Sequence, residues 1–324
     1  MSPLLEVDRL CVDLGSRHGS LRLLDDVSFA IAPGEMLGFV GESGAGKSLT
    51  GSAVIGLLEP HCHMTGGRIV YDGRRIDDLP ADAVRRLRGR QIGAIFQDPL
   101  TSLNPLYTIG HQLVETMRTH LALTEAEAIL RAVDLLEETG IQGAAQRLQQ
   151  YPHQLSGGMR QRVVIALALA AEPRLVIADE PTTALDVSVQ AQVMALLRRL
   201  CRDRGMAVML VTHDMGVIAE SCDRVAVMYA GRIVEIGPVR DVIQAPAHPY
   251  TFGLMGSIPP MTGERGRLIQ IDGAMPRPGL IPSGCAFHPR CSRGWDRCRI
   301  ERPELMAVGT SRSACWLHDP RRTG

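Results

Sequence analysis

The chain carries no net charge, few aromatic side chains and no long apolar run. Its 324 residues hold 35 basic and 35 acidic side chains, and 4% are aromatic. The neutral balance argues against a generic nucleic-acid-binding surface. No apolar run reaches the roughly 20 residues of a membrane span, and the first residues show no basic region followed by an apolar core. We therefore expect no secretory signal and a cytoplasmic protein whose membrane role, if any, depends on partners.

What is present is an ordinary globular composition with an uneven distribution of cysteine. The chain is 45% hydrophobic and 22% charged, which suits one large domain with an appendage, or two domains. Four of its eight cysteines are scattered, whereas the other four lie near the end of the chain, at Cys285, Cys291, Cys298 and Cys315. In a reducing cytoplasm such a cluster favours a metal or iron–sulfur site over disulfides.

Residues 41–48 read Gly-Glu-Ser-Gly-Ala-Gly-Lys-Ser and fit the phosphate-binding P-loop pattern. Gly41 and Gly46 lack a Cβ, so the backbone can approach an anion closely. The turned amides and the helix that starts behind them direct partial positive charge toward that anion. Lys47 is suited to reach the β- and γ-phosphates and the Ser48 hydroxyl to hold Mg²⁺.

Two observations argue against a chance glycine-rich turn. Residues 36–40 predict a buried strand before the loop, and residues 48–58 predict the helix after it. Lys47 is also the only lysine in the chain, every other fixed cation being arginine. Arginine is a planar fork whereas lysine is a compact point charge, so the one lysine stands where a P-loop needs it.

The rest of the chain predicts alternating strands and helices. Edge strands are expected at 4–14 and 22–31, a strand and turn at 66–76, and further strands at 92–96, 175–178, 207–211, 224–229 and 232–235. Helices are expected at 82–90, 109–120, 124–140 with Gly140 as its C-cap, from the glycine pair after 156 to 171, and 187–201. Residues 246–284 are rich in Pro and Gly and predict a linker.

Further polar groups follow predicted strands or begin a predicted helix. Ser156 and the two glycines after it form a second helix start suited to an anion. Asp179 and Glu180 follow an apolar strand, and at the carboxyl end of a parallel strand they suit Mg²⁺ coordination through water and polarisation of an attacking water. A simple helix cap is the alternative. His213 also follows a strand and is either structural or within reach of the same ligand.

Together these motifs resemble the ATP-binding subunit of an ABC transporter, over roughly residues 4–245. The resemblance rests on the P-loop, Gln97 after its strand, the Leu-Ser-Gly-Gly-Met signature at 155–159, the acidic pair, the Ala-Leu-Asp of 184–186 and His213, all in the family's order. It implies an α/β P-loop ABC ATPase cassette with a RecA-like core, an antiparallel β subdomain and an inserted helical subdomain at about 100–172. Residues 246–324 would form a small Cys-rich C-terminal extension.

Several segments look like the dipeptide/oligopeptide importer branch, which also includes nickel and glutathione importers. They are Phe-Gln-Asp-Pro-Leu-Thr-Ser-Leu-Asn-Pro at 96–105, Tyr-Pro-His-Gln at 151–154, the stretch 178–187, Ala-His-Pro-Tyr-Thr at 247–251 and Gly-Cys-Ala-Phe-His-Pro-Arg-Cys at 284–291. The branch implies an ATPase that powers uptake of peptides or, as alternatives, of nickel, glutathione or another small solute. A soluble ABC ATPase acting on nucleic acid or ribosomes fits less well, since the chain shows neither fused cassettes nor long coiled coils. An exporter cassette conflicts with the importer-like tail.

The resemblance also implies a mechanism in which two cassettes dimerise with ATP between them. The signature helix of one cassette would bind the γ-phosphate held by the other, and Asp186 would communicate across the dimer. Glu180 would orient the attacking water, His213 would contact the γ-phosphate, and Gln97 would sense Mg²⁺ beside Ser48. The implied ATP- and Mg²⁺-contacting set is Gly41, Ser43, Gly44, Gly46, Lys47, Ser48, Leu49, Gln97, Ser156, Gly157, Gly158, Asp179, Glu180 and His213.

The implied partners are a second cassette, two integral-membrane permeases and a periplasmic or extracellular solute-binding protein, with no nucleic acid. The second cassette is expected to be a paralogue. The subunit would then lie at the cytoplasmic face of the plasma or inner membrane, held through the permeases. One position departs from the family: Leu14 stands where an aromatic residue usually stacks on adenine, with Arg17 or His18 as substitutes.

The spacing of the four C-terminal cysteines, with 5, 6 and 16 residues between them, matches neither zinc fingers nor ferredoxin runs. Four thiolates suit either Zn²⁺ or an iron–sulfur cluster. The branch has members with a [4Fe–4S] cluster on cysteines arranged like these, so the resemblance favours the cluster, with zinc as the alternative. His288 and His318 are further candidate ligands. The segment's few large apolar residues make a poor core, which favours a metal as a structural staple.

Overall fold

A computed structural model of the chain describes residues 2–16, 19–182, 185–256 and 270–320. They form two compact units, each assembled from segments far apart in the sequence. The first comprises Met1–Leu4, Ile31–Met36 and Asp78–Leu210, and the second Leu5–Ala30, Leu37–Asp77 and Val211–Gly324. No helix within the described residues has both the length and the hydropathy to cross a membrane.

The first unit combines buried parallel strands with a group of helices. Its strands follow the order β8-β7-β6, and β6 pairs with β7 in parallel, with Ile92 opposite Leu175. The strands are β6 (Ile92–Ile95), β7 (Leu175–Asp179) and β8 (Ala207–Val211). The last two consist almost entirely of buried apolar residues, as expected of strands covered on both faces.

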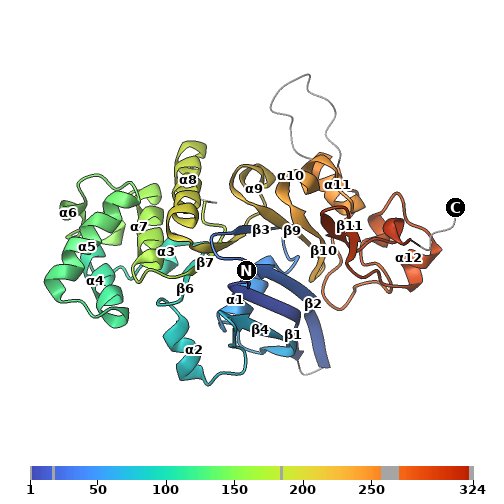
Figure 1. The fold of residues 1–324 in the computed structure, drawn as a ribbon, viewed down its shortest axis with the longest axis horizontal. Helices are drawn as coiled ribbons and strands as arrows, with labels where there is room; N and C mark the ends of the chain where they lie inside the picture. The colour runs from blue at the N-terminus through green and yellow to red at the C-terminus, as the bar shows by residue number, and fades with distance from the viewer. Residues whose placement is uncertain (1, 17–18, 183–184, 257–269, 321–324) are drawn as a thin grey trace. The chain divides into compact units, whose positions relative to one another are not determined.

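The helices of the first unit lie mostly between β6 and β7 in sequence. Figure 1 shows α4 to α7 gathered as one helical group, and α5 begins with a capping box between Thr124 and Glu127. The helices are α2 (Ala81–Leu87), α3 (Pro99–Ser102), α4 (Ile109–His120), α5 (Glu125–Glu138), α6 (Ala144–Arg147), the 3₁₀ turn η1 (Pro152–Gln154), α7 (Gly157–Leu169) and α8 (Val187–Arg204). The predicted helix at 109–120 is confirmed. Thr139 is the C-cap of α5, and Gly140 follows it with the expected positive φ of 82°.

The second unit contains a four-stranded sheet in the order β2-β1-β4-β5. Its strands are β1 (Leu5–Ser16), β2 (Gly19–Ile31), β4 (Cys62–Tyr71) and β5 (Arg74–Arg75). The prediction of an edge strand at 4–14 is wrong, because β1 lies between β2 and β4. The alternation there is weak because a β-bulge near Arg9 (φ 49°) shifts the buried positions from Leu5 and Val7 to Leu10 and Val12.

The second sheet segment of this unit follows the order β11-β12-β10-β9-β3. The strands are β3 (Met36–Val40), β9 (Arg224–Tyr229), β10 (Arg232–Pro238), β11 (Met306–Val308) and β12 (Ser311–Ser313). Strands β3 and β9 run parallel, whereas β9–β10, β10–β12 and β12–β11 are antiparallel. Residues 270–320, called the C-terminal segment below, therefore extend through β11 and β12 the same sheet that contains β3, the strand leading into the P-loop.

The helices of the second unit are α1 (Lys47–Val54), α9 (Met215–Ser221), α10 (Val239–Gln244), α11 (Pro249–Gly256), α12 (Asp296–Ile300) and the 3₁₀ turns η2 (His288–Arg290) and η3 (Trp316–His318). The prediction of a linker from residue 246 is wrong over its first part. Residues 249–256 form α11, and Tyr250 and Thr251 within it are fully buried. Residues 257–269 of the predicted linker lie outside the described part.

Candidate functional site

The P-loop connects buried strand β3 to helix α1, as the sequence predicts. Gly41 has a φ of 154°, and a Cβ there would lie 2.2 Å from the Met228 carbonyl oxygen, so only glycine fits. Lys47 begins α1 and is 6% exposed. Its Nζ donates hydrogen bonds to the carbonyl oxygens of Gly41 at 2.8 Å and Glu42 at 3.1 Å. The sole lysine is thus folded back over the loop that would hold the phosphates.

The side chains beyond the P-loop that the sequence assigns to ATP fall in both units. His213, which follows β8, belongs to the second unit, as does the P-loop, and its side chain is exposed. Gln97, Asp179, Glu180 and the Ser-Gly-Gly signature belong to the first unit. Arg17, His18 and Ala184 lie outside the described residues.

Within the first unit the structure brings Gln97 and Glu180 together. The Gln97 Nε2 donates to the Glu180 Oε2 at 3.1 Å. Glu180 directly follows β7 with a φ of 46°, a region that side-chain-bearing residues rarely occupy. Such conformations cluster at active sites, where surrounding structure holds them in place. Glu180 is not the N-cap of the next described helix, since Asp186 caps α8.

The signature segment forms a capped helix start, as predicted. Ser156 is the N-cap of α7, and its hydroxyl accepts a hydrogen bond from the Met159 amide at 3.4 Å. Ser156 and Gly157 are exposed, and a Cβ on Gly157 would meet no atom within 4 Å. Glycine there leaves open space in front of a helix N-terminus, the arrangement that suits an approaching anion.

Asp186 and Asp214 are the N-caps of α8 and α9, the helices that follow β7 and β8. Asp186 accepts from the Val189 amide at 2.9 Å at the start of α8. Asp214 accepts from the Gly216 amide at 2.7 Å at the start of α9. Leu14, at the predicted adenine position, lies on β1 opposite Cys62 and is half-buried.

The four C-terminal cysteines line one small cavity of about 20 Å³. Burial raises the pKa of the Cys285 and Cys315 thiols to about 11, and the charges of the neighbouring cysteines add to the shift. Yet in the described part of the chain no group of three or more His, Cys, Asp or Glu side chains is arranged as a metal site. The cysteines converge as the sequence suggests, but the predicted iron–sulfur or zinc site is not confirmed.

The two histidines proposed as further ligands are already hydrogen-bonded. His288 lines the thiol cavity, and its Nδ1 lies 2.9 Å from the Cys285 carbonyl oxygen. His318 Nε2 lies 2.7 Å from the carbonyl oxygen of Ala247. These contacts fix both rings as parts of the C-terminal fold.

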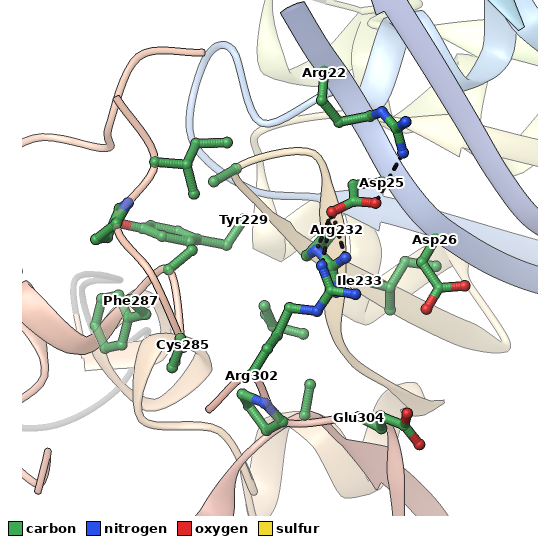
Figure 2. A pocket seen from close by; sticks show the side chains of 18 of the residues that line it. Arg22, Asp25, Asp26, Tyr229, Arg232, Ile233, Cys285, Phe287, Arg302 and Glu304 are labelled. Atoms are coloured by element: carbon green, nitrogen blue, oxygen red, sulfur yellow. Dashed lines mark hydrogen bonds and ion pairs between the residues drawn. The ribbon is translucent and has the colours of Figure 1, made fainter. Parts of the chain in front are cut away.

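A separate cavity of about 790 Å³ lies in the second unit between β1–β2, β9–β10 and the C-terminal segment. Figure 2 shows Arg22, Arg232 and Arg302 directed at Asp25. Burial alone would raise the pKa of Asp25, but the hydrogen bond from Arg232 and the three arginine charges lower it. No P-loop residue is among the described residues that line this cavity. The Asp25–Arg302 pair joins the C-terminal segment to β2.

Sequence reasoning missed two residues that contact the P-loop, Arg290 and Tyr250. Arg290 pairs with Glu42, Nη1 to Oε1, at 2.9 Å, and the Tyr250 hydroxyl accepts from the Glu42 amide at 3.0 Å. Both lie in the importer-like segments at 284–291 and 247–251. Those segments indicated a family, but nothing in them indicated which part of the fold they touch.

Comparisons with known proteins agree with the resemblance that the sequence motifs indicate. The ABC transporter family matches residues 24–183, and the C-terminal region of oligopeptide/dipeptide transporters matches residues 234–298. The oligopeptide transport ATP-binding protein AppD of Bacillus subtilis is 43% identical over 98% of both chains. The dipeptide transport ATP-binding protein DppD of Escherichia coli is 42% identical over 96% of this chain and 95% of its own.

Among solved structures, the dimeric post-hydrolysis state of the ATP-binding cassette MJ0796 bound to ADP and Pi has a TM-score of 0.66 at 28% identity. The match covers 73% of this chain and 99% of that one. The structure of cbiO1 from Clostridium perfringens, part of the ABC transporter complex cbiONQ, has a TM-score of 0.65 at 29% identity over 76% of this chain and 92% of that one.

Proposed function

The chain belongs to the ABC transporter ATP-binding family, and from this premise we propose that it hydrolyses ATP to power import of di- or oligopeptides. The observation that carries the proposal is the similarity to oligopeptide and dipeptide transport ATP-binding proteins over nearly the whole chain. The family's C-terminal region supports the same branch, since it matches residues 234–298.

In the proposed site the P-loop holds the phosphates of ATP. On nucleotide binding, Lys47 would exchange its two carbonyl acceptors for the β- and γ-phosphates, and the amides at residues 43–49 would surround the phosphate oxygens. Mg²⁺, when bound, neutralises charge on the phosphates. The donor types fit this ion, since Ser48 offers a hydroxyl and Gln97 an amide oxygen.

Glu180 and His213 complete the proposed chemistry. With its carboxylate held by Gln97, Glu180 would orient the attacking water, and Asp179 would support Mg²⁺ through water. His213 would contact the γ-phosphate. Catalysis of this kind depends mostly on positioning and electrostatics.

The remaining wall of the site is proposed to come from a second cassette. The helix start at Ser156, Gly157 and Gly158, whose first two residues are exposed, would face the γ-phosphate held by the partner cassette's P-loop, and hydrolysis would follow closure of the dimer. The dimeric cassette structures to which this chain is similar support that arrangement. We propose a paralogous second cassette, two integral-membrane permeases that hold the pair at the cytoplasmic face of the membrane, and a solute-binding protein.

Substitution of Glu180 tests the catalytic assignment. We expect Glu180→Gln to keep MgATP binding and to lower ATP hydrolysis and peptide uptake by about 100-fold or more, since general-base contributions reach that size. Lys47→Ala should abolish binding itself. Glu172→Gln is a matched control, because Glu172 also has a positive φ, 53°, but pairs with Arg131. Undiminished uptake by Glu180→Gln would contradict the assigned role.

We propose further that Cys285, Cys291, Cys298 and Cys315 hold a [4Fe–4S] cluster, with Zn²⁺ as the alternative. Their convergence on one cavity and the chemistry of four thiolates support this, although the described residues form no preformed metal site. A cysteine thiol must lose its proton to bind a metal. Binding of a cluster would therefore require Cys285 and Cys315 to lose their protons although burial raises their pKa.

Anaerobic purification with metal analysis tests this proposal. A cluster should give a brown protein with absorbance near about 400 nm and about four iron atoms per chain. Cys298→Ser should lose the colour, whereas Cys201→Ser, at a buried cysteine of α8, should keep it. Colourless protein with one zinc would support the alternative, and colourless metal-free protein would exclude both.

A further inference from the structure

The C-terminal segment contacts the P-loop through one ion pair. Arg290 precedes Cys291 in this segment, and its Nη1 lies 2.9 Å from the Oε1 of Glu42, the second residue of the P-loop. The Arg290 side chain is 7% exposed and that of Glu42 is 30% exposed. Because the guanidinium is largely removed from water, loss of Glu42 would leave it as a poorly solvated charge.

The other donors of Arg290 are also engaged. Nε donates to the Asp272 carbonyl oxygen at 2.9 Å and Nη2 to that of Gly273 at 3.2 Å. Nη1 also donates to the Tyr229 hydroxyl at 3.4 Å. Together with Glu42 these acceptors engage all three guanidinium nitrogens, an arrangement that a lysine ammonium cannot reproduce.

Tyr250 makes a second connection to the same P-loop residue. Its hydroxyl accepts from the Glu42 amide at 3.0 Å. The ring is fully buried and packs edge-on against Tyr229 at 4.7 Å, and Phe287 lies 5.4 Å away. Phe287 is part of the C-terminal segment and also lines the cysteine cavity. Phe287 of the C-terminal segment therefore packs against Tyr229 at the end of β9, the strand that pairs with β3.

Glu42 is in turn the residue whose carbonyl oxygen accepts from Lys47. Its side chain is held by Arg290, its amide by Tyr250, and its carbonyl by the P-loop lysine at 3.1 Å. Displacement of Glu42 therefore displaces the loop at the point where Lys47 is anchored. The contacts run without interruption from the cysteine cavity to the P-loop.

We propose that Arg290 is a positioning residue for nucleotide binding, through which the C-terminal segment sets the conformation of the P-loop. Arg290 acts on Glu42 and does not touch the nucleotide. ATP affinity then depends on the C-terminal segment being folded against the loop. The inference rests on the proposed role of the P-loop and Lys47 in holding ATP.

The test is MgATP binding to the full-length chain by titration calorimetry. Arg290→Ala should weaken MgATP binding about tenfold, within the range of couplings between contacting residues. Arg290→Lys should fall between wild type and Arg290→Ala, because it keeps the charge and loses the fork. In the Glu42→Gln background, Arg290→Ala should weaken MgATP binding much less than it does in the wild-type chain. In steady-state hydrolysis the KM for ATP should rise while kcat changes little.

Arg302→Ala is the matched control. Arg302 also belongs to the C-terminal segment and pairs with Asp25 at 2.9 Å, but Asp25 keeps Arg22 and Arg232 as partners. This variant should leave MgATP affinity unchanged. Thermal melting without nucleotide separates folding from positioning: the expected weakening persists at temperatures where Arg290→Ala is fully folded.

Two outcomes would overturn the inference. Unchanged affinity in Arg290→Ala, with Lys47→Ala abolishing binding, would show that Arg290 only fastens the C-terminal segment. Equal weakening in Arg290→Ala and Arg302→Ala would show a general loss of folding. If Lys47→Ala also left binding intact, the assignment of the P-loop itself would fail.

Discussion

At the scale of single residues, Glu180 combines a strained backbone with a specific partner. A left-handed conformation at a residue with a side chain costs on the order of 1–3 kcal/mol. The sequence predicts that Glu180 follows a strand and orients an attacking water, and the structure adds the φ of 46° and the hydrogen bond from Gln97. Both features place the carboxylate at the carboxyl end of β7, where it can act on a ligand.

His248 shows how a residue of the importer-like segment is used. It is 1% exposed, and burial together with the nearby charge of His318 lowers its pKa to about 3. Its Nδ1 accepts from the Tyr250 amide at 3.0 Å, and its own amide donates to Glu235 at 2.8 Å. The neutral ring therefore fixes the start of α11, which carries Tyr250 to the P-loop.

This burial predicts acid sensitivity. In the unfolded chain His248 takes up a proton below about pH 6.5, whereas the folded chain does not until about pH 3. The unfolded state thus binds more protons, and stability falls with decreasing pH by about 1.4 kcal/mol per unit from this group. Glu235 acts in the opposite direction, because burial raises its pKa and its protonation in acid relieves that cost.

Denaturant unfolding at about pH 7 and about pH 5.5 measures the effect. His248→Asn keeps an acceptor for the Tyr250 amide and removes the titration, so we expect a smaller loss of stability between the two conditions than in wild type. His111→Asn, at an exposed position of α4, should keep the wild-type loss. An unchanged loss in His248→Asn would assign the sensitivity to other groups.

At the scale of elements, helix starts carry both stability and function. Thr124 and Ser156 cap α5 and α7 in the first unit, and each hydroxyl accepts from the amide three residues on. Thr124 forms a complete capping box with Glu127, whereas Ser156 opens into solvent before two glycines. The same local chemistry therefore serves folding in one helix and, as proposed, ATP in the other.

Paired substitutions separate the two roles. Thr124→Ala and Ser156→Ala should each lower the free energy of unfolding by about 1 kcal/mol, the usual value of an N-cap. Only Ser156→Ala should also lower ATP hydrolysis by the assembled transporter, because only α7 is proposed to meet the partner's nucleotide. Equal hydrolysis by both variants would contradict the assignment of the signature.

At the scale of the whole molecule, the proposed catalytic residues are divided between the two compact units. The P-loop and His213 belong to one compact unit, and Gln97, Glu180 and the signature helix to the other. In the proposed mechanism, the ATP site of each cassette is completed only by the signature helix of its partner. Under the proposed roles, ATP binding would need the P-loop and hydrolysis the assembled pair of cassettes, so we expect the two to be separable.

Light scattering of mixed cassettes tests the proposed pair. MgATP should bring the Glu180→Gln chain and the proposed paralogous cassette into a complex of two cassettes, because ATP is then bound and not consumed. Lys47→Ala should fail to form it. Complex formation that is equal with and without MgATP would contradict closure around the nucleotide.

The sequence by itself determined the P-loop motif, the signature motif, the strand of Asp179 and, to within three residues, the limits of the four longest described helices, α4, α5, α7 and α8. These depend on local rules: glycine at positive φ, apolar periodicity and side chains that cap helices. Leu169 ends α7 and Arg204 ends α8, within three residues of the predicted limits. The family motifs added the branch.

Only the tertiary structure decided the interior position of β1, the helix within the predicted linker and the contact of Arg290 with Glu42. That ion pair joins residues 248 positions apart, and no local pattern encodes such a separation. Its partners meet because the buried rings of Tyr229, Tyr250 and Phe287 bring three distant segments together. Packing of side chains across the fold, rather than the propensity of any segment, therefore connects the cysteine-rich end of the chain to its P-loop.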